Sequence, residues 1–208
     1  MTGPKGRRPL HRRAAETLDV VLARDPSVRT RGEALLHPTV IALACHRAGH
    51  RLHRRCHYRS ARLVSTVAKV LTGGIEIHPG ARIGRRFFVD HGSGVVIGET
   101  AVIGDDVSLF HQVTLGSTGW WHDGPGERDR TARRHPRLGN GVTVGAGATL
   151  LGPITVGDNA LIGAMSLVTS DVPDKSRVRA VPASIPSPGT TSPAHEPPTG
   201  PAGKKTHR

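Results

Sequence analysis

The chain has 208 residues, a formal net charge of +13 and two cysteines. This length allows one sizeable domain, or one domain with a small appendage, and two cysteines exclude a disulfide framework. No run of about eighteen apolar residues occurs, so we expect no membrane span, and an aromatic content of only 3% argues against nucleic-acid binding by base stacking.

The first segment, residues 1–13, is basic and contains no acidic side chain. Its composition predicts a disordered arm rather than a packed element. No apolar stretch of the signal-peptide kind follows it, so the sequence indicates a cytoplasmic protein.

Residues 14–74 are predicted to form an α-helical segment. From Val40 onward, apolar residues recur at spacings of three and four, which is the spacing of one helix face. Pro38 is placed to begin a helix at its first turn, and the pair Gly73-Gly74 is placed to end the last helix. His46 and His50 lie four residues apart on one face, a spacing that metal ligands also use.

From about residue 75 the helical period disappears, and an aliphatic residue followed by a small residue recurs in steps of six. The aliphatic positions 138, 144, 150, 156, 162 and 168 keep this period unbroken. Such a repeat is typical of a parallel β-helix, in which three flat sides close each coil. We expect the aliphatic side chains inside the prism and the small residues at its corners, where a larger side chain would strain the backbone. A glycine-rich sandwich or barrel fits less well, because alternating strands have a period of two.

Two interruptions divide the repeat in the predicted β-helix domain, residues 75–185. The gap between Ile83 and Ile97 is 14 residues, which implies a two-residue adjustment, and the gap between Leu115 and Leu138 is 23 residues. The segment at about 117–134 is therefore predicted to leave the prism as an extended loop, and loops on rigid scaffolds commonly carry function. The proline-rich residues 186–208 are predicted to be a disordered tail.

Several stretches resemble the serine O-acetyltransferase family of the hexapeptide-repeat acyltransferase superfamily. The most specific is GIEIHPGARIGRRFFVDHGSGVVIGET at 74–100, followed by VTLGSTG at 113–119, RHPRL at 134–138 and VGAGATLLGPITVGDNALIGA at 144–164. The helical segment adds RDPSVR and CHRAGHRL, so the resemblance covers about residues 14–185. It implies an α-helical segment followed by a left-handed parallel β-helix. It also implies transfer of an acetyl group from acetyl-CoA to the hydroxyl of L-serine, a step of cysteine biosynthesis.

The resemblance also implies the catalytic residues. His91 matches the general base, which accepts the proton of the serine hydroxyl as that hydroxyl attacks the thioester. An imidazole, whose ordinary pKa is about 6.5, suits this role near neutral pH. Glu76 matches the acid that orients the base and stabilises its protonated form.

The acceptor site implied by the resemblance uses both charges of a free amino acid. Asp25 and Asp90 match residues that hold its ammonium group. Arg134 and His135 match the pair that binds its carboxylate, for which an arginine fork is well suited.

The resemblance implies a binding path for acetyl-CoA and an assembly. Thr118, Ala146 and Ala164 match the small positions along which the pantetheine arm lies. The assembly is a homotrimer with active sites between adjacent prisms, and in some members two trimers pair. No metal is implied, even at His46 and His50.

Many members of this family end in an isoleucine that enters the active site of a cysteine synthase. This chain ends in Lys204-Lys205-Thr206-His207-Arg208. We therefore expect no stable complex of that type.

Three alternatives remain open. One is an acetyltransferase for another hydroxy amino acid or a specialised metabolite, which the enlarged loop with Trp120 and Trp121 suggests. Another is a metal-dependent β-helix hydratase of the carbonic anhydrase type, which would need three converging histidines. The third is a trimeric scaffold or nucleic-acid-binding protein without activity, but the presence of Glu76, Asp90 and His91 together with His135 argues against it.

Overall fold

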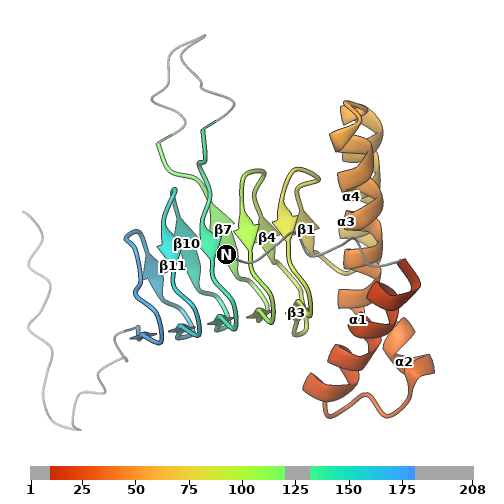
Figure 1. Cartoon of the computed structure of the whole chain (residues 1–208), viewed down its shortest axis with the longest axis horizontal. Helices are drawn as coiled ribbons and strands as arrows, with labels where there is room; N and C mark the ends of the chain where they lie inside the picture. Colours follow the sequence, from red (N-terminus) through yellow and green to blue (C-terminus); the bar gives the residue numbers. More distant parts are fainter. Residues whose placement is uncertain (1–9, 120–131, 181–208) are drawn as a thin grey trace, which may run out of the picture.

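The computed structural model describes residues 10–119 and 132–180. Within these residues, a group of helices lies at one end of a stack of short parallel strands (Figure 1). The helices are α1 (Leu10–Arg24), α2 (Arg31–Leu35), α3 (Pro38–Arg54) and α4 (Tyr58–Leu71). None of these described helices has the length and apolar character needed to cross a membrane.

The helix ends follow the local sequence signals, with one difference. Helix α3 begins at Pro38, and the Thr39 backbone N–H donates to Nδ1 of His37, which caps the helix. Helix α4 ends at Leu71 and is followed by Gly73 and Gly74, both at positive φ. Both boundaries were predicted from the proline and the glycine pair. Helix α1 begins at Leu10, inside the segment 1–13 that we predicted to be a disordered arm.

The strands form three parallel sheets, one on each side of a prism. Sheet A has the order β1-β4-β7-β10-β13, sheet B the order β11-β8-β5-β2, and sheet C the order β14-β12-β9-β6-β3. The strands are β1 (Glu76–Ile77), β2 (Arg82–Ile83), β3 (Phe88–Val89), β4 (Val96–Ile97), β5 (Val102–Ile103), β6 (Ser108–Leu109), β7 (Thr114–Gly116), β8 (Arg137–Leu138), β9 (Thr143–Val144), β10 (Thr149–Leu151), β11 (Thr155–Val156), β12 (Leu161–Ile162), β13 (Leu167–Val168) and β14 (Arg177–Val178). The chain therefore visits sheets A, B and C in turn, as the hexapeptide repeat predicts.

The first coil is two residues longer than the second. Glu76 pairs with Val96, twenty residues further on, whereas Val96 pairs with Thr114, eighteen residues further on. The extra residues lie in the corner 90–95 between β3 and β4. This confirms the predicted two-residue adjustment, and it enlarges the corner that carries His91.

The aliphatic repeat fills the prism. Positions 138, 144, 150, 156, 162 and 168 are each at most 5% exposed. Each such side chain contributes about 1.5–3 kcal/mol by leaving water. The core of the prism is therefore a column of stacked aliphatic side chains, as predicted.

The recurring glycines have a different physical reason from the one we predicted. Most of them, including Gly84, Gly104 and Gly139, do not have a positive φ. A Cβ atom at Gly104 would instead lie 2.6 Å from the carbonyl oxygen of Gly139 in the next coil. Close stacking of coils, rather than backbone strain at the corner, thus excludes larger residues at these positions.

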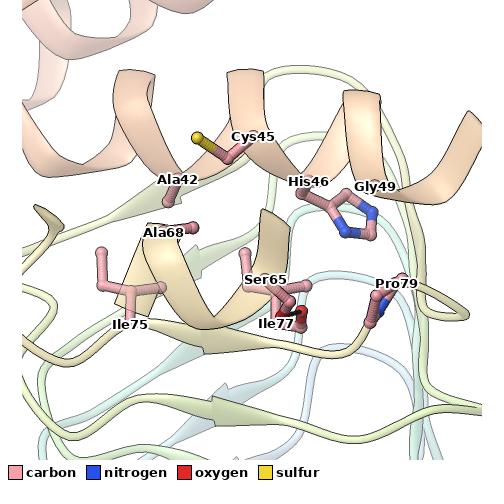
Figure 2. A pocket seen from close by; sticks show the side chains of 9 residues that line it. All are labelled: Ala42, Cys45, His46, Gly49, Ser65, Ala68, Ile75, Ile77 and Pro79. Atoms are coloured by element: carbon pink, nitrogen blue, oxygen red, sulfur yellow. Dashed lines mark hydrogen bonds between the residues drawn. The ribbon is translucent and has the colours of Figure 1, made fainter. Parts of the chain in front are cut away.

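Helices α3 and α4 cover the first coil through a small apolar contact (Figure 2). His46 is buried there, and burial lowers its pKa to about 3, so its ring is neutral. Ser65 donates to the carbonyl oxygen of Ile77 at 2.6 Å, and Nδ1 of His50 donates to that of Pro79 at 2.8 Å. Ser65 and His50 therefore bond the helices to the first coil, and His46 is buried in the same contact.

Candidate active site

Two edges of the prism carry the predicted site residues. The CA edge, between sheets C and A, comprises the corners 90–95, 110–113, 145–148 and 163–166. The AB edge, between sheets A and B, comprises the corners 78–81, 98–101 and 133–136 together with residues 117–119 and 152–154. Sheet A lies between these two edges, so its outer face separates them.

His91 projects from the enlarged corner of the CA edge. Its side chain is 76% exposed, and its Nε2 lies 3.8 Å from a carboxylate oxygen of Asp90. Its ring meets that of His111, on the next coil, edge to face at a centroid distance of 6.0 Å. His91 therefore stands at the surface beside a carboxylate, where a second molecule can reach its ring.

Asp25 joins this corner from the loop after α1. Its Oδ1 accepts hydrogen bonds from the backbone and hydroxyl of Ser27, and these bonds hold the pKa of the Asp25 carboxyl below its ordinary value. Its Oδ2 lies 3.3 Å from Nε2 of His37, whose ring stacks on Phe88 at 5.6 Å. Phe88 lies one residue before Val89, the end of β3, so Asp25 is held close to the start of the 90–95 corner.

His37 was not singled out by the sequence. Its Nδ1 accepts the Thr39 N–H, so the neutral ring carries its proton on Nε2, which faces Asp25. Burial lowers the pKa of His37, and the charges of Asp25 and Asp90 offset this only in part. The only sequence signal was its position just before Pro38, where a helix cap is expected.

Glu76 lies on β1 at the start of sheet A, and its carboxylate pairs with Nζ of Lys69 at 2.7 Å. Within the described residues, the contacts of His91 are with Asp90 and His111 and not with Glu76. The predicted pairing of Glu76 with His91 therefore stays a prediction.

Arg134 lies on the AB edge and is held at both ends. Its guanidinium pairs with Glu99 at 2.9 Å, and its backbone N–H donates to Oγ1 of Thr100 at 2.8 Å. Its Nε is buried and has no hydrogen-bond partner among the described residues. Glu99 and Thr100 belong to the family-like block at 74–100, but neither of them was assigned a role from the sequence.

His135 is buried beside Arg134 and has a defined tautomer. Its Nδ1 accepts the Thr100 backbone N–H at 3.2 Å and lies 2.8 Å from the Thr100 hydroxyl. Burial lowers the pKa of His135, so the ring is neutral and carries its proton on Nε2. Within the described part of the chain, Nε2–H of His135 has no acceptor and can donate to an anionic group.

Gly98 makes room for this ring. A Cβ atom at Gly98 would overlap Cδ2 and Nε2 of His135 and would lie 2.8 Å from its Cγ. The sequence identified Gly98 only as one member of the repeat. The buried position of the His135 ring therefore depends on Gly98, which lies one coil earlier on the same AB edge.

The predicted cofactor positions divide between the edges. Ala146 and Ala164 lie on the CA edge in the coils that follow His111, where the Met165 N–H donates to the carbonyl of Ala146. Thr118 lies on the AB edge, and a Cβ at Gly152 would be 3.3 Å from its hydroxyl. On the CA edge, Met165 lies beside Ala164 and is 74% exposed, so its side chain projects into the space proposed for the pantetheine arm.

Within the described residues, no hydrogen bond, ion pair or ring contact joins the His91 corner to the His135 corner. Asp25, Asp90 and His91 lie together on one edge, whereas Arg134 and His135 lie together on the other. A substrate held by all five would require the AB edge of a second copy to face the CA edge of the first.

Among the described residues, His53, His78 and Glu99 place possible metal-binding atoms within 4.8 Å of one another. Nδ1 of His78 accepts the Gly80 N–H, so the proton of the neutral ring is on Nε2. Neither ring nitrogen then has an electron pair available for a metal ion. Glu99 is already paired with Arg134. Ordinary hydrogen bonding therefore accounts for this cluster without a metal.

The coil geometry and the six-residue repeat place the chain among the hexapeptide-repeat proteins. Residues 135–170 match the family model described as bacterial transferase hexapeptide (six repeats). The predicted fold class, a helical segment followed by a left-handed parallel β-helix, is confirmed.

Comparison of the whole chain identifies the family. The chain is 52% identical over 161 residues to the serine acetyltransferase of Helicobacter pylori, which covers 77% of this chain and 88% of that protein. The chain therefore belongs to the serine acetyltransferase family, as the sequence resemblance predicted.

Solved structures of the family have the same fold. Neisseria gonorrhoeae serine acetyltransferase in complex with serine gives a TM-score of 0.73 at 36% identity, covering 84% of this chain and 68% of that one. The Brucella abortus enzyme in complex with coenzyme A gives 0.73 at 35% identity, covering 84% and 66%. This chain covers 66% to 68% of the length of these two solved chains, and 61% of serine acetyltransferase isoform 3 of Entamoeba histolytica.

Proposed function

We propose that this protein transfers the acetyl group of acetyl-CoA to the hydroxyl of L-serine, giving O-acetyl-L-serine and CoA for cysteine biosynthesis. The observation that carries the proposal is the set of side chains on the two edges of the prism, in a chain that belongs to this family. The CA edge has an exposed histidine beside carboxylates, and the AB edge has an arginine and a histidine that are held by Glu99 and Thr100. Relatives bear the name serine acetyltransferase, and solved relatives hold serine or coenzyme A.

In this proposal His91 is the general base. Its ring accepts the proton of the serine hydroxyl as the oxygen attacks the thioester carbonyl. The carbon–sulfur bond then breaks, and the sulfur of CoA takes that proton from His91 as it leaves. No proton remains on the enzyme at the end of the cycle. The exposure of the His91 ring gives substrates access to it, and Asp90 stabilises the imidazolium that forms.

The acceptor is held by its two charged groups. Asp25 and Asp90 bind the ammonium, and hydrogen bonds from Ser27 keep Asp25 ionised at neutral pH. Arg134 and Nε2–H of His135, contributed by a second copy, bind the carboxylate. A sugar hydroxyl lacks both groups, so this arrangement favours a free amino acid.

Glu76 is proposed to orient the base once the site is assembled. It lies on the outer face of sheet A, where Lys69 now holds its carboxylate. To reach His91, this carboxylate must exchange Lys69 for the imidazole. The ion pair is about half exposed, so the exchange costs on the order of 1 kcal/mol or less.

The site needs more than one subunit, and we propose a homotrimer. The outer face of sheet A, between the two edges, exposes Val96 and Leu167. Apolar residues at that place support packing against other copies. Helix α4 exposes Leu63, Val67 and Val70, a surface through which two trimers can pair. Light scattering of the purified protein distinguishes three chains from six.

The acceptor is tested by the release of free CoA thiol from acetyl-CoA. The purified protein is supplied in turn with L-serine, D-serine, L-homoserine and L-threonine. The proposal predicts the highest kcat/KM for L-serine. A higher value for another hydroxy amino acid would identify a sibling acetyltransferase, and no thiol release with any acceptor would contradict the proposed function.

Sharing of the site between subunits is tested by complementation. Chains carrying His91→Ala and chains carrying His135→Ala are each unable to form a complete site. Mixed trimers, formed by refolding the two together, contain some sites with both residues intact and should regain part of the wild-type activity. Mixtures that remain as inactive as either variant alone would mean that each chain uses its own two histidines.

Two further sequence expectations stay predictions. A cytoplasmic location is one. The absence of a stable cysteine synthase complex is the other, and it depends on residues 204–208, which lie outside the described residues.

A further inference from the structure

A large cavity with a strongly basic lining lies between the helices and sheet B. Its volume is about 760 Å³, within the range of about 300–1,000 Å³ found for small-molecule sites. It is bounded by α1, α3 and the segment from β2 to β3. Of the described residues that line it, eight are arginines and Glu16 alone is acidic.

The positive charge of this cavity is not neutralised by its own lining. Glu16 is already bonded by the guanidinium of Arg85, at 2.6 and 3.2 Å. Arg86 pairs with Asp106, which lies outside the cavity lining. Within the described residues, the arginines at 47, 51 and 54 have no hydrogen bond or ion pair to a carboxylate.

Arg47 shows that clustering these positive charges is electrostatically unfavourable. It is half-buried, and its hydrogen bond goes to the neutral hydroxyl of Thr17 at 3.2 Å. Burial, together with the charge of Arg13, holds the pKa of Arg47 below its ordinary value, although Glu16 acts in the opposite direction. A bound anion would remove this repulsion.

The cavity is separate from the proposed catalytic site. Strand β2 is the end strand of sheet B on the side of the helices. The positions proposed for the pantetheine arm, Ala146 and Ala164 on the CA edge and Thr118 after β7 on the AB edge, all lie in later coils than the first coil, which lines the cavity. The phosphates of acetyl-CoA, carried at the far end of that arm, therefore do not explain the arginines.

We propose that this cavity binds a chain of linked phosphate groups. Arginine forks bind phosphate oxygens in pairs, and here they come from three elements around one space, so several phosphate groups can be bound at once. Among the described residues that line the cavity there is no phenylalanine, tyrosine or tryptophan, so these residues offer no aromatic platform for a nucleobase. The recognised chemistry is the phosphate chain, whether it is inorganic or the tail of a nucleotide.

The test measures binding to the intact chain by isothermal titration calorimetry at fixed ionic strength. Sodium tripolyphosphate, ATP and citrate are the probes, and citrate has multiple negative charges without phosphate. We expect one tripolyphosphate per chain, bound at least tenfold more tightly than citrate. Equal binding of ATP assigns the site to phosphate chains of either source, and weaker binding of ATP assigns it to inorganic chains. Equal binding of citrate would overturn the proposal.

Matched variants locate the binding site. Arg51→Gln with Arg54→Gln removes two exposed cavity arginines on α3, and we expect it to weaken tripolyphosphate binding at least tenfold. Arg59→Gln with Arg177→Gln removes the same charge from exposed positions outside the cavity and should change binding less than twofold. Equal effects of the two pairs would mean attraction by net charge alone and would overturn the proposal.

A further arm separates this site from the catalytic one. The affinity of the tightest CoA site, measured by the same calorimetry, should be unchanged by the Arg51→Gln, Arg54→Gln pair. Loss of that CoA affinity in the variant would make the cavity part of the co-substrate site and would overturn the inference of a separate site. Because the readout is binding, this outcome does not depend on whether L-serine is the acceptor.

Discussion

The substitution Gly98→Ala tests whether the position of the His135 ring, between Gly98 and Thr100, supports catalysis. Gly98 does not have a positive φ, so alanine is compatible with the backbone conformation. The added Cβ would overlap the imidazole of His135, and the ring must leave its position between Gly98 and Thr100. The effect of this small change is therefore expected in the acceptor site.

The expected loss follows from one hydrogen bond. His135 presents Nε2–H to the carboxylate of the acceptor, and a hydrogen bond to a charged group contributes about 1.5–3 kcal/mol. Because each 1.4 kcal/mol corresponds to a factor of about ten, kcat/KM for L-serine should fall roughly 10- to 100-fold. KM for acetyl-CoA should change much less.

The assay is thiol release by wild type, Gly98→Ala, His135→Ala and the double variant. If alanine at 98 acts through the ring of His135, it should have no further effect once that ring is removed. Gly32→Ala, whose Cβ would meet only Thr30 at 3.8 Å, serves as the control. Full activity of Gly98→Ala would refute this role of the His135 ring position. So would an equal loss of activity when Gly98→Ala is added to wild type and to His135→Ala.

Three further predictions concern the neighbouring groups. His37→Asn keeps a side chain able to cap α3 but loses the contact with Asp25, so KM for L-serine should rise several-fold without a matching change for acetyl-CoA; equal KM values would contradict the positioning role. Glu99→Gln removes the charge that pairs with Arg134 and should raise KM for L-serine about two- to fivefold with little change in kcat, as expected for a partly exposed pair. His46 has a folded-state pKa of about 3, below the value of about 6.5 for an unfolded histidine, so the unfolded chain binds the proton first as pH falls. The free energy of unfolding should therefore decrease from about pH 6.5 downward, by about 1 kcal/mol per pH unit more in wild type than in His46→Gln, as measured by urea denaturation; identical slopes would contradict burial of a neutral His46.

The sequence predicted the prism well because its signal is periodic. A residue every six positions must face the same interior, and positions 138 to 168 are buried accordingly. The irregular gap between Ile83 and Ile97 predicted an adjustment, and the extra residues lie in the corner of His91. Proline and glycine signals likewise placed the start of α3 and the end of α4.

The individual contacts of the site were beyond prediction from one sequence. Glu99 and Arg134 are 35 residues apart, and Lys69 binds Glu76 across the junction of helix and prism. Such pairs depend on how coils stack and how helices dock, which a local pattern does not specify. Gly98 is a clear case. A side chain is excluded there by the ring of His135 in the next coil, and not by the backbone conformation of Gly98 itself.

The most direct measurement of the central claim is the rate of acetyl transfer to L-serine by His91→Ala. A general base typically contributes about 10²- to 10⁴-fold, so kcat should fall by that amount. The melting temperature should remain close to that of wild type, because the replaced side chain is 76% exposed. A variant that is equally stable and turns over at the wild-type rate would show that another group accepts the proton.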